Sequence, residues 1–384
     1  MAIVGAAWRR GALEAPRGPK SRPLGEFLTR IFETMTLSRR HLMALAGATV
    51  AAPATLRTAW GQSPQVTLRM HHFLPPASNA HQRFLTPWAR KVEAESGGRI
   101  KIDIFPAMQL GGTPPQLYDQ ARDGVADIIW TLPGNTPGRF PAIEAIELPF
   151  IAGKRAVTNS KALAELAPTH FLKEFSEVQP LCLWAHDHGL IHANKPVKTQ
   201  ADLAGLKLRF PTRQAGEALR ALGANAIGMP IPQVPEALSQ NVIDGAVVPW
   251  EVVPSLRLHE LVRYHTEIPG SPTLYTASFI LAMNKPKYDG LPADLKAVID
   301  ANSGMPAAIM AGEMWDERGR SVADMVKGRS RNTISLLAED EAAKWRAATK
   351  PVEEAWLKAA RERNIDGQKI VDDVRAAVAK HMLA

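Results

Sequence analysis

The sequence predicts an α/β fold in which two lobes face each other across a cleft. Strand and helix patterns alternate from about residue 65 to 185 and again from 205 to 248, and the last third of the chain is almost entirely helical. Strands that alternate with helices are typical of parallel βαβ units. Ligands of open α/β sheets bind beyond the carboxyl ends of the strands, so we expect the binding site in the cleft.

The first α/β unit opens on a β-prone run, Val66 to His71, and a helical segment from about Ala80 to Glu95 that ends at Gly97-Gly98. Arg99 to Phe105 alternates polar and apolar residues, which predicts a second strand. The remaining predicted elements of this unit are a helix at 113–124, a strand at 126–132, helices near 155–175 and a strand at 178–185.

The second unit repeats this order and leads into the helical end. It is predicted to contain strands at 205–210, 225–228 and 242–248, and helices at 213–222 and 232–241. A longer β-prone run follows at 274–283. Helices at 291–327, 338–363 and 367–382 follow, with a strand at 333–337. We expect the chain to cross between the lobes near 185–190 and 270–275. The predicted first lobe is 62–185 with about 274–315, and the second is 186–273 with about 316–384.

The basic residues are concentrated in the leader. Residues 1–61 hold 9 Lys/Arg and 3 Asp/Glu of the 46 and 38 in the chain, which leaves 37 and 35, a net charge of +2. Because residues 62–384 are nearly neutral, they have no excess of positive charge to attract nucleic-acid phosphates, and nucleic-acid binding is disfavoured. The Arg39-Arg40 pair, the short apolar run 43–52 and the small-residue site 59–61 predict a twin-arginine signal peptide over 35–61.

Export through this peptide predicts a periplasmic protein. Residues 1–34 are interpreted as a disordered extension or as sequence upstream of a true start at Met35. No later apolar run reaches the roughly 20 residues of a membrane span, so the mature protein is not expected to be membrane-embedded. The single cysteine, Cys182, lies in an apolar run and is expected in the core, which excludes a disulfide framework.

Arg209 is the strongest candidate for ligand binding. It lies near the end of the strand 205–210, on the face opposite Leu208 and Phe210, and Pro211 ends the strand. A guanidinium at a strand's carboxyl end can hold a carboxylate through two parallel hydrogen bonds. A surface salt bridge is the alternative interpretation.

Two further strand ends carry candidates. Trp250 and Glu251 follow the strand 242–248, where they could wall an apolar ligand and accept a ligand hydroxyl or help to hold a cation. Gly134 and Asn135 lie in a tight turn after the strand 126–132 and could reach a bound group. A buried tryptophan with a solvated glutamate, and a plain turn, are the alternatives.

Histidines offer weak support for a metal. His186, His188 and His192 form an H-x-H-x3-H pattern, which with His71-His72 could supply a zinc site. The chain has no His-Glu-x-x-His, no G-x-S-x-G, no P-loop and no G-x-G-x-x-G motif. We therefore expect that the protein binds no cofactor and is not an enzyme.

The chain holds an ordered set of short motifs: Ser96–Arg99, Phe105-Pro106, Gln109–Gly112, Gly124–Asp127, Glu147–Phe150, Gly205–Arg209, Asp244-Gly245, Met283–Lys285 and Leu291-Pro292. In this order and spacing the set resembles the periplasmic solute-binding subunit of tripartite ATP-independent periplasmic (TRAP) transporters, the DctP family. The resemblance covers the chain from about Gln65 to the C-terminus.

The resemblance implies a two-lobe periplasmic binding protein fold, type II-like, with hinge strands and long C-terminal helices that span the lobes. It implies capture of an organic acid and delivery to the small and large subunits of a membrane permease. Arg209 matches the family's carboxylate-binding arginine. The second arginine of many members is missing here, so His188 or a backbone amide is expected to replace it. Some members of the family hold a cation between the ligand and a Trp/Glu pair. The order and offset of Trp250 and Glu251 differ from those of that pair, so the sequence does not support a bridging cation.

The ligand is expected to be a monocarboxylate with an apolar or aromatic body. His72, Phe73 and Tyr275 complete the predicted set of binding residues, and Phe73, Trp130, Trp250 and Tyr275 would form the wall. Two other functions stay open: a periplasmic metal-dependent hydrolase that uses the histidines, and a ligand-sensing subunit of a membrane receptor.

Overall fold

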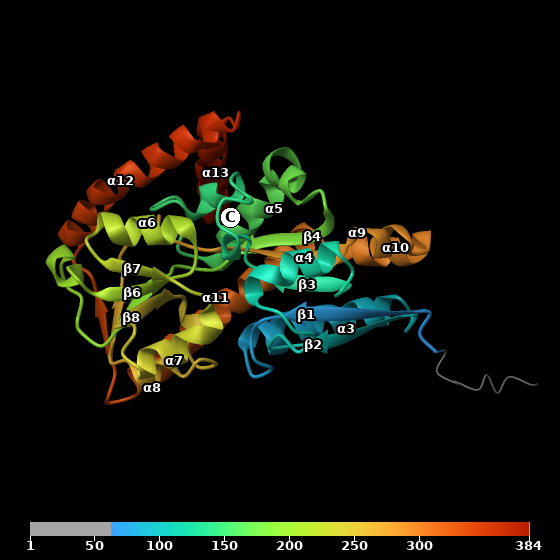
Figure 1. The fold of residues 1–384 in the computed structure, drawn as a ribbon, viewed down its shortest axis with the longest axis horizontal. Helices are drawn as coiled ribbons and strands as arrows, with labels where there is room; N and C mark the ends of the chain where they lie inside the picture. The colour runs from blue at the N-terminus through green and yellow to red at the C-terminus, as the bar shows by residue number, and fades with distance from the viewer. Residues whose placement is uncertain (1–62, 384) are drawn as a thin grey trace, which may run out of the picture. The chain divides into compact units, whose positions relative to one another are not determined.

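Two β-sheets organise residues 63–383, the part of the chain that the computed structural model describes (Figure 1). The predicted extension 1–34 and signal peptide 35–61 lie outside these residues. Each sheet forms the centre of one lobe, as the two-lobe prediction requires.

The sheet of the first lobe has five strands in the order β2-β1-β3-β10-β4. Their bounds are β1 (Val66–His72), β2 (Ile100–Phe105), β3 (Ile128–Thr131), β4 (Val178–Ala185) and β10 (Ser278–Asn284). β1 is parallel to β2 and β3, whereas β10 is antiparallel to β3 and β4. All seven residues of β10 are buried, as expected for a central strand covered on both faces.

The sheet of the second lobe has six strands in the order β11-β9-β5-β8-β6-β7. Their bounds are β5 (Leu190–Ala193), β6 (Lys207–Phe210), β7 (Asn225–Gly228), β8 (Gly245–Val248), β9 (Tyr264–Glu267) and β11 (Thr333–Leu336). β6 is parallel to β7 and β8, and β9 to β11, but β5 is antiparallel to β8 and β9.

Shorter helices cover the sheets. On the first lobe, they are α3 (Thr86–Glu95), α4 (Leu117–Arg122), α5 (Ala156–Leu166), α9 (Lys285–Asp289) and α10 (Ala293–Ala301). On the second lobe, they are α6 (Arg213–Ala221), α7 (Val234–Ser239) and α8 (Leu258–Leu261). Short 3₁₀ or π turns precede or follow several of them: η1 (Ala80–Leu85), η2 (Pro114–Gln116), η3 (Pro133–Asn135), η4 (Ile143–Glu147), η5 (Ala167–Phe171), η6 (Leu172–Phe175), η7 (Gln200–Leu203), η8 (Ile231–Gln233) and η9 (Trp250–Val252).

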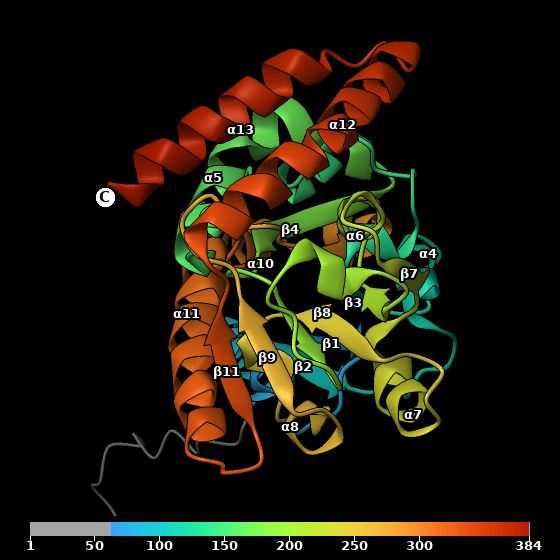
Figure 2. The same ribbon diagram turned by 90° about the vertical axis from the view of Figure 1, so that its left-hand side faces the viewer.

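Three long helices end the chain: α11 (Met305–Lys327), α12 (Glu339–Glu362) and α13 (Gly367–Met382). α11 packs on α5 and β4 of the first lobe and on η9 and β11 of the second, so this helix ties the lobes together. Figure 2 shows it alongside β11. α12 packs on α6, and α13 returns to α5.

The predicted helix 291–327 is divided into α10 and α11. Gly304 adopts a φ of 59°, a conformation that favours glycine and ends the helical path. Its N–H donates to the carbonyl of Leu181 on β4. The break therefore fixes the start of α11 against the first sheet.

The chain crosses between the sheets through 186–189, from β4 to β5, and through 268–277, from β9 to β10. β4 and β5 lead the chain from the first lobe into the second, and β9 and β10 lead it back. The outgoing and returning strands therefore pair antiparallel, β4 with β10 and β5 with β9, and break the predicted parallel pattern. β5 and β9, which have four residues each, were not predicted from the sequence. Within residues 63–383, no helix combines the length and the apolar character needed to cross a bilayer.

Candidate functional site

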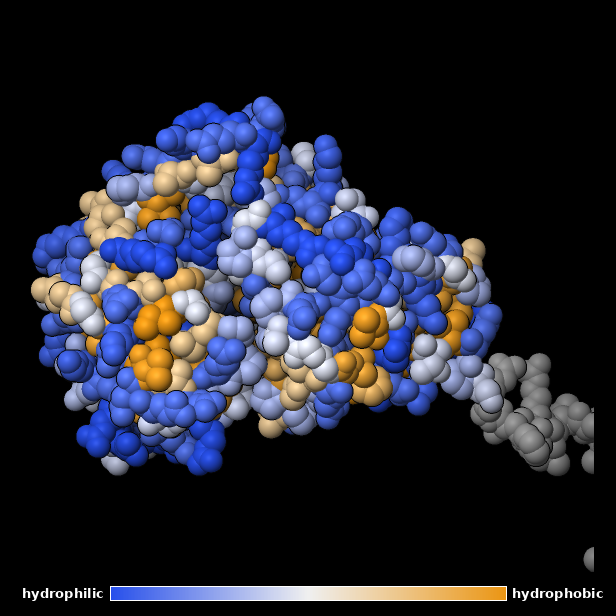
Figure 3. Space-filling model, in the orientation of Figure 1, coloured by the Kyte–Doolittle hydropathy of each residue, from blue (hydrophilic) through white to orange (hydrophobic). Residues whose placement is uncertain are grey.

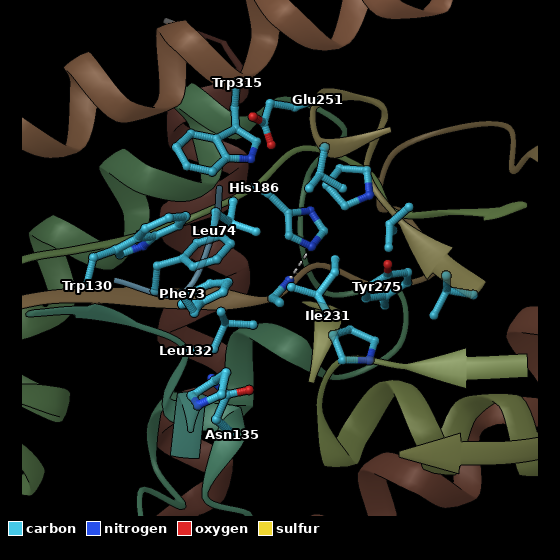
Figure 4. A pocket seen from close by; sticks show the side chains of 18 of the residues that line it. Phe73, Leu74, Trp130, Leu132, Asn135, His186, Ile231, Glu251, Tyr275 and Trp315 are labelled. Atoms are coloured by element: carbon cyan, nitrogen blue, oxygen red, sulfur yellow. Dashed lines mark hydrogen bonds between the residues drawn. The ribbon is translucent and has the colours of Figure 1, made fainter. Parts of the chain in front are cut away.

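A cavity lies between the two sheets, beyond the carboxyl ends of β1, β3, β6 and β8 (Figure 4). Both crossings, β10 and α11 complete its wall. It contains about 540 Å³ of space free of protein atoms, including its opening. The outer face seen in Figure 3 is mostly hydrophilic.

Arg209 brings a buried positive charge to this cavity. Arg209 is only 2% exposed. Its guanidinium donates from Nε to the carbonyl of Met229 (2.9 Å) and from Nη1 to the carbonyl of Val247 (3.4 Å). Within residues 63–383, no carboxylate forms an ion pair with it. Burial lowers the pKa of Arg209 to about 10, so the group stays charged at neutral pH. A buried cation without a counter-ion is suited to an anionic ligand.

Tyr275 supplies a hydrogen-bond donor near Arg209. Its side chain is buried, and its hydroxyl has no hydrogen-bond partner among the described residues. Burial raises the pKa of this phenol above its usual value, with a smaller opposing effect from Arg209, so the hydroxyl keeps its proton. The ring lies against Gly189, where a β-carbon would stand 2.0 Å from Cε1. Gly189 therefore creates the space for Tyr275.

Aromatic rings form the apolar wall. The ring centroids of Phe73 and Trp130 are 4.8 Å apart, and those of Phe279 and Trp315 are 5.4 Å apart. All four side chains line the cavity and are buried. Such a wall favours a flat apolar ligand body over a polyhydroxylated one.

Glu251 adds a carboxyl group to the lining. The residue is 1% exposed, and burial raises the pKa of its carboxyl to about 7. Its Oε1 has no hydrogen-bond partner among residues 63–383, and the same is true of the indole nitrogens of Trp130 and Trp315. These atoms can therefore pair with polar groups of a ligand without losing a hydrogen bond within the described residues.

Contacts across the cleft hold the two lobes together. Asn79 of the first lobe donates to the backbone carbonyl of Glu251 at 2.9 Å. Gln214 on α6 donates to Glu144 on η4 at 2.6 Å. The structure therefore represents a closed arrangement around the cavity.

Five of the nine predicted site residues line the cavity: Phe73, Asn135, Arg209, Glu251 and Tyr275. The amide of Asn135 also donates to the hydroxyl of Thr131 at 3.3 Å. The other four are placed elsewhere.

His72 and Gly134 lie beside the cavity and have other contacts. The His72 ring pairs with His81 (2.9 Å) and accepts the N–H of Leu74 (3.3 Å), and burial lowers the pKa of His72 to about 3. Gly134 packs against Thr212 from the opposite lobe and is not part of the cavity lining.

His188 and Trp250 lie in a second hollow at the hinge, with Asp187 and Glu267. The Trp250 indole donates to Glu267 at 2.8 Å. Trp250 and Glu251 are adjacent on a tight 3₁₀ turn, so their side chains point in different directions. His188 makes no hydrogen bond through its ring within the described residues, although its backbone N–H donates to Lys154.

The histidines of the metal hypothesis are not brought together. His186 lines the cavity, but its Nδ1 contacts the carbonyl of Asp187 (2.5 Å) and its Nε2 accepts the N–H of Ala277 (2.9 Å). Burial lowers the pKa of His186 to about 3, so this ring is neutral. His192 instead pairs with His265 in the second sheet. Among residues 63–383, no three His, Cys, Asp or Glu side chains are grouped to hold a metal ion.

Trp315 is a lining residue that the sequence did not predict. It comes from α11, far along the chain from the strand ends. Gly312 and Gly319 lie one turn before it and one turn after it, and β-carbons there would stand 2.5 Å from the backbone of Val157 and 2.8 Å from the carboxyl of Asp187. Two glycines seven residues apart on a helix indicate close packing around the residue between them.

Comparisons with known proteins agree with this arrangement. The profile of the family described as bacterial extracellular solute-binding protein, family 7 (DctP) matches residues 70–359. A C4-dicarboxylate-binding periplasmic protein, DctP of Rhodobacter capsulatus, is 24% identical over 318 residues, covering 82% of this chain and 93% of its own.

Solved structures of higher identity bind aromatic acids. A TRAP solute-binding protein from Rhodoferax ferrireducens T118, in complex with copurified benzoate, is 46% identical, with a TM-score of 0.80 over 83% of this chain and 98% of its own. A marine metagenome TRAP solute-binding protein specific for aromatic acid ligands, in complex with 3-hydroxybenzoate, is 44% identical, with a TM-score of 0.81 over 83% and 99%.

Proposed function

Because the chain belongs to family 7 of the bacterial extracellular solute-binding proteins, the TRAP solute-binding proteins, we propose that it captures an aromatic monocarboxylate and delivers it to a TRAP membrane permease. Arg209 is the observation that carries this proposal, because its buried guanidinium has no acidic partner within residues 63–383. Arg209 is the one Lys or Arg among the described residues that line the cavity, and one guanidinium suits a single carboxylate.

The ligand's two parts have separate places in the proposed complex. The carboxylate lies against Arg209 and the Tyr275 hydroxyl, and the ring lies among Phe73, Trp130 and Phe279. The guanidinium alone neutralises the carboxylate, so the complex needs no bridging cation. The benzoate and 3-hydroxybenzoate complexes of the relatives support an aromatic body.

The remaining steps follow the family. TRAP solute-binding proteins are periplasmic, and the Arg39-Arg40 leader supports export by the twin-arginine route. The small and large permease subunits are the proposed partners. In this proposal the protein binds and releases its ligand without chemical change.

Titration calorimetry with three matched compounds tests the proposed function. Benzoate is expected to bind, and benzamide, which has the same ring without the charge, should bind at least a hundredfold more weakly. Succinate should also bind weakly, because its second carboxylate would be placed among apolar rings. Equal affinity for benzoate and benzamide, or tighter binding of succinate, would contradict the proposal.

A further inference from the structure

Two buried polar atoms in the cavity wall have complementary chemistry. Oε1 of Glu251 is a hydrogen-bond acceptor and Nε1 of Trp315 is a donor, and neither has a partner among residues 63–383. Glu251 belongs to η9 and Trp315 to α11, two elements that pack against each other. Figure 4 shows the two side chains beside each other.

We propose that the ring of the ligand carries a hydroxyl group, which donates to Oε1 of Glu251 and accepts from Nε1 of Trp315. A hydroxyl is the small substituent that both donates and accepts at one atom. A halogen or a methyl group would leave both protein atoms unpaired. The inference rests on the proposed function, because the carboxylate at Arg209 sets the orientation of the ring.

Apolar lining residues stand along the chain between the two polar sites. The guanidinium of Arg209 is tied to Val247 on β8, whereas Glu251 lies beyond the end of that strand. Val248 and Pro249 line the cavity between these points. An aromatic ring between a carboxylate and a hydroxyl has this order of polar, apolar and polar surface.

Closure of the lobes fixes the position of Glu251. Its backbone carbonyl accepts from Asn79 of the first lobe at 2.9 Å. Burial raises the pKa of its carboxyl to about 7, so at pH 8 the group is largely an ionised acceptor. Hydrogen bonds to an ionised acceptor are shorter and stronger than neutral ones.

The test compares benzoate with 2-, 3- and 4-hydroxybenzoate by titration calorimetry at pH 8. At least one hydroxybenzoate should bind wild type about ten- to a hundredfold more tightly than benzoate. Glu251→Met should abolish this preference and Trp315→Phe should reduce it. Glu251→Gln, with the same shape, replaces Glu251→Met if the latter does not fold, and should reduce the preference.

Trp184→Phe is the matched control. The Trp184 indole nitrogen is also buried without a partner in the described region and its ring stacks in the same aromatic cluster, but it does not line the cavity. This variant should keep the full preference for the hydroxylated ligand.

The outcomes separate the inference from the proposed function. If benzoate binds but no hydroxybenzoate binds more tightly, or if the preference survives both the Glu251 and the Trp315 variants, the hydroxyl site is wrong and the aromatic carboxylate function stands. If neither benzoate nor any hydroxybenzoate binds, both are overturned.

Discussion

Gly134 and Thr212 touch across the cleft with no room for another atom. A β-carbon on Gly134 would stand 2.5 Å from Cγ2 of Thr212 and 2.9 Å from its Cβ. Gly134 belongs to η3 of the first lobe, and Thr212 precedes α6 of the second. The lobes can therefore close fully only if position 134 is a glycine.

Gly134→Ala should therefore keep the lobes apart and weaken ligand binding while each lobe stays folded. Overpacking at this site is expected to oppose closure by about 1–3 kcal/mol, which corresponds to roughly five- to 150-fold in affinity. Small-angle scattering with saturating ligand should show a larger radius of gyration than for wild type. Gly328→Ala, whose β-carbon would meet nothing closer than 3.6 Å, is the control. Equal affinity in the two variants would contradict the role of this contact.

Gly189→Ala should weaken binding by displacing Tyr275. The added methyl would stand 2.0 Å from one ring carbon of Tyr275 and 2.5 Å from its hydroxyl oxygen, so the ring must move. Calorimetry should show a loss of affinity similar in size to that of Tyr275→Phe. A Gly189→Ala protein that binds as wild type does would show that the Tyr275 hydroxyl has no part in binding.

Arg209→Met should weaken carboxylate binding by about thirty- to several-thousand-fold, because removal of one partner of a buried charge pair costs about 2–5 kcal/mol. Arg209→Lys keeps the charge without the two-pronged geometry and should fall between wild type and Met. Lys207→Met, at an exposed position on the same strand, is the control for calorimetry. Binding of Arg209→Met within a few-fold of wild type would exclude the carboxylate site.

Glu147 should make stability decrease as the pH rises. Its Oε1 accepts from the N–H (2.9 Å) and the hydroxyl (2.6 Å) of Ser278, but burial raises the pKa of its carboxyl from 4.5 to about 7. Between these values the unfolded chain has lost the proton that the folded protein keeps, so rising pH favours unfolding by up to about 1.4 kcal/mol per pH unit.

Denaturation of wild type and Glu147→Gln across pH 4 to 8 measures this effect. The free energy of unfolding of wild type, relative to the variant, should fall between about pH 4.5 and 7 and stay level above. Glu217→Gln, at a partly exposed surface position, should follow wild type. A difference that does not change with pH would show that Glu147 titrates normally.

Arg39→Lys together with Arg40→Lys should block export, because the twin-arginine route requires the pair. The precursor should accumulate in the cytoplasm, whereas the wild-type mature protein should begin near Gln62. Fractionation and N-terminal sequencing measure both. Normal export of the double variant would exclude this route.

Strand ends are where the sequence analysis and the cavity lining coincide. Arg209 lies near the end of β6 and Glu251 follows β8, and the carboxyl ends of parallel strands meet at one edge of a sheet. Their arrival at the same cavity follows from this rule. The rule says nothing of α11, which is why Trp315 was missed.

The sequence did not predict in which direction each side chain of a short turn points. Trp250 and Glu251 are adjacent on η9, yet one contacts Glu267 at the hinge and the other lines the cavity. A periodic pattern needs more residues than a three-residue turn provides. His72 shows the same limit, since its hydrogen bond to His81 depends on how η1 packs on β1.

The burial of Arg209 has a kinetic consequence. Because the guanidinium is 2% exposed and Asn79, Gln214 and Thr212 hold the lobes together, a bound ligand cannot leave until the lobes separate. The dissociation rate is then limited by the rate of opening, and ligands that bind with different strength can share one slow exit step. A permease that pulls Gly134 away from Thr212 would act as a release factor, and it would speed unloading without contacting the ligand.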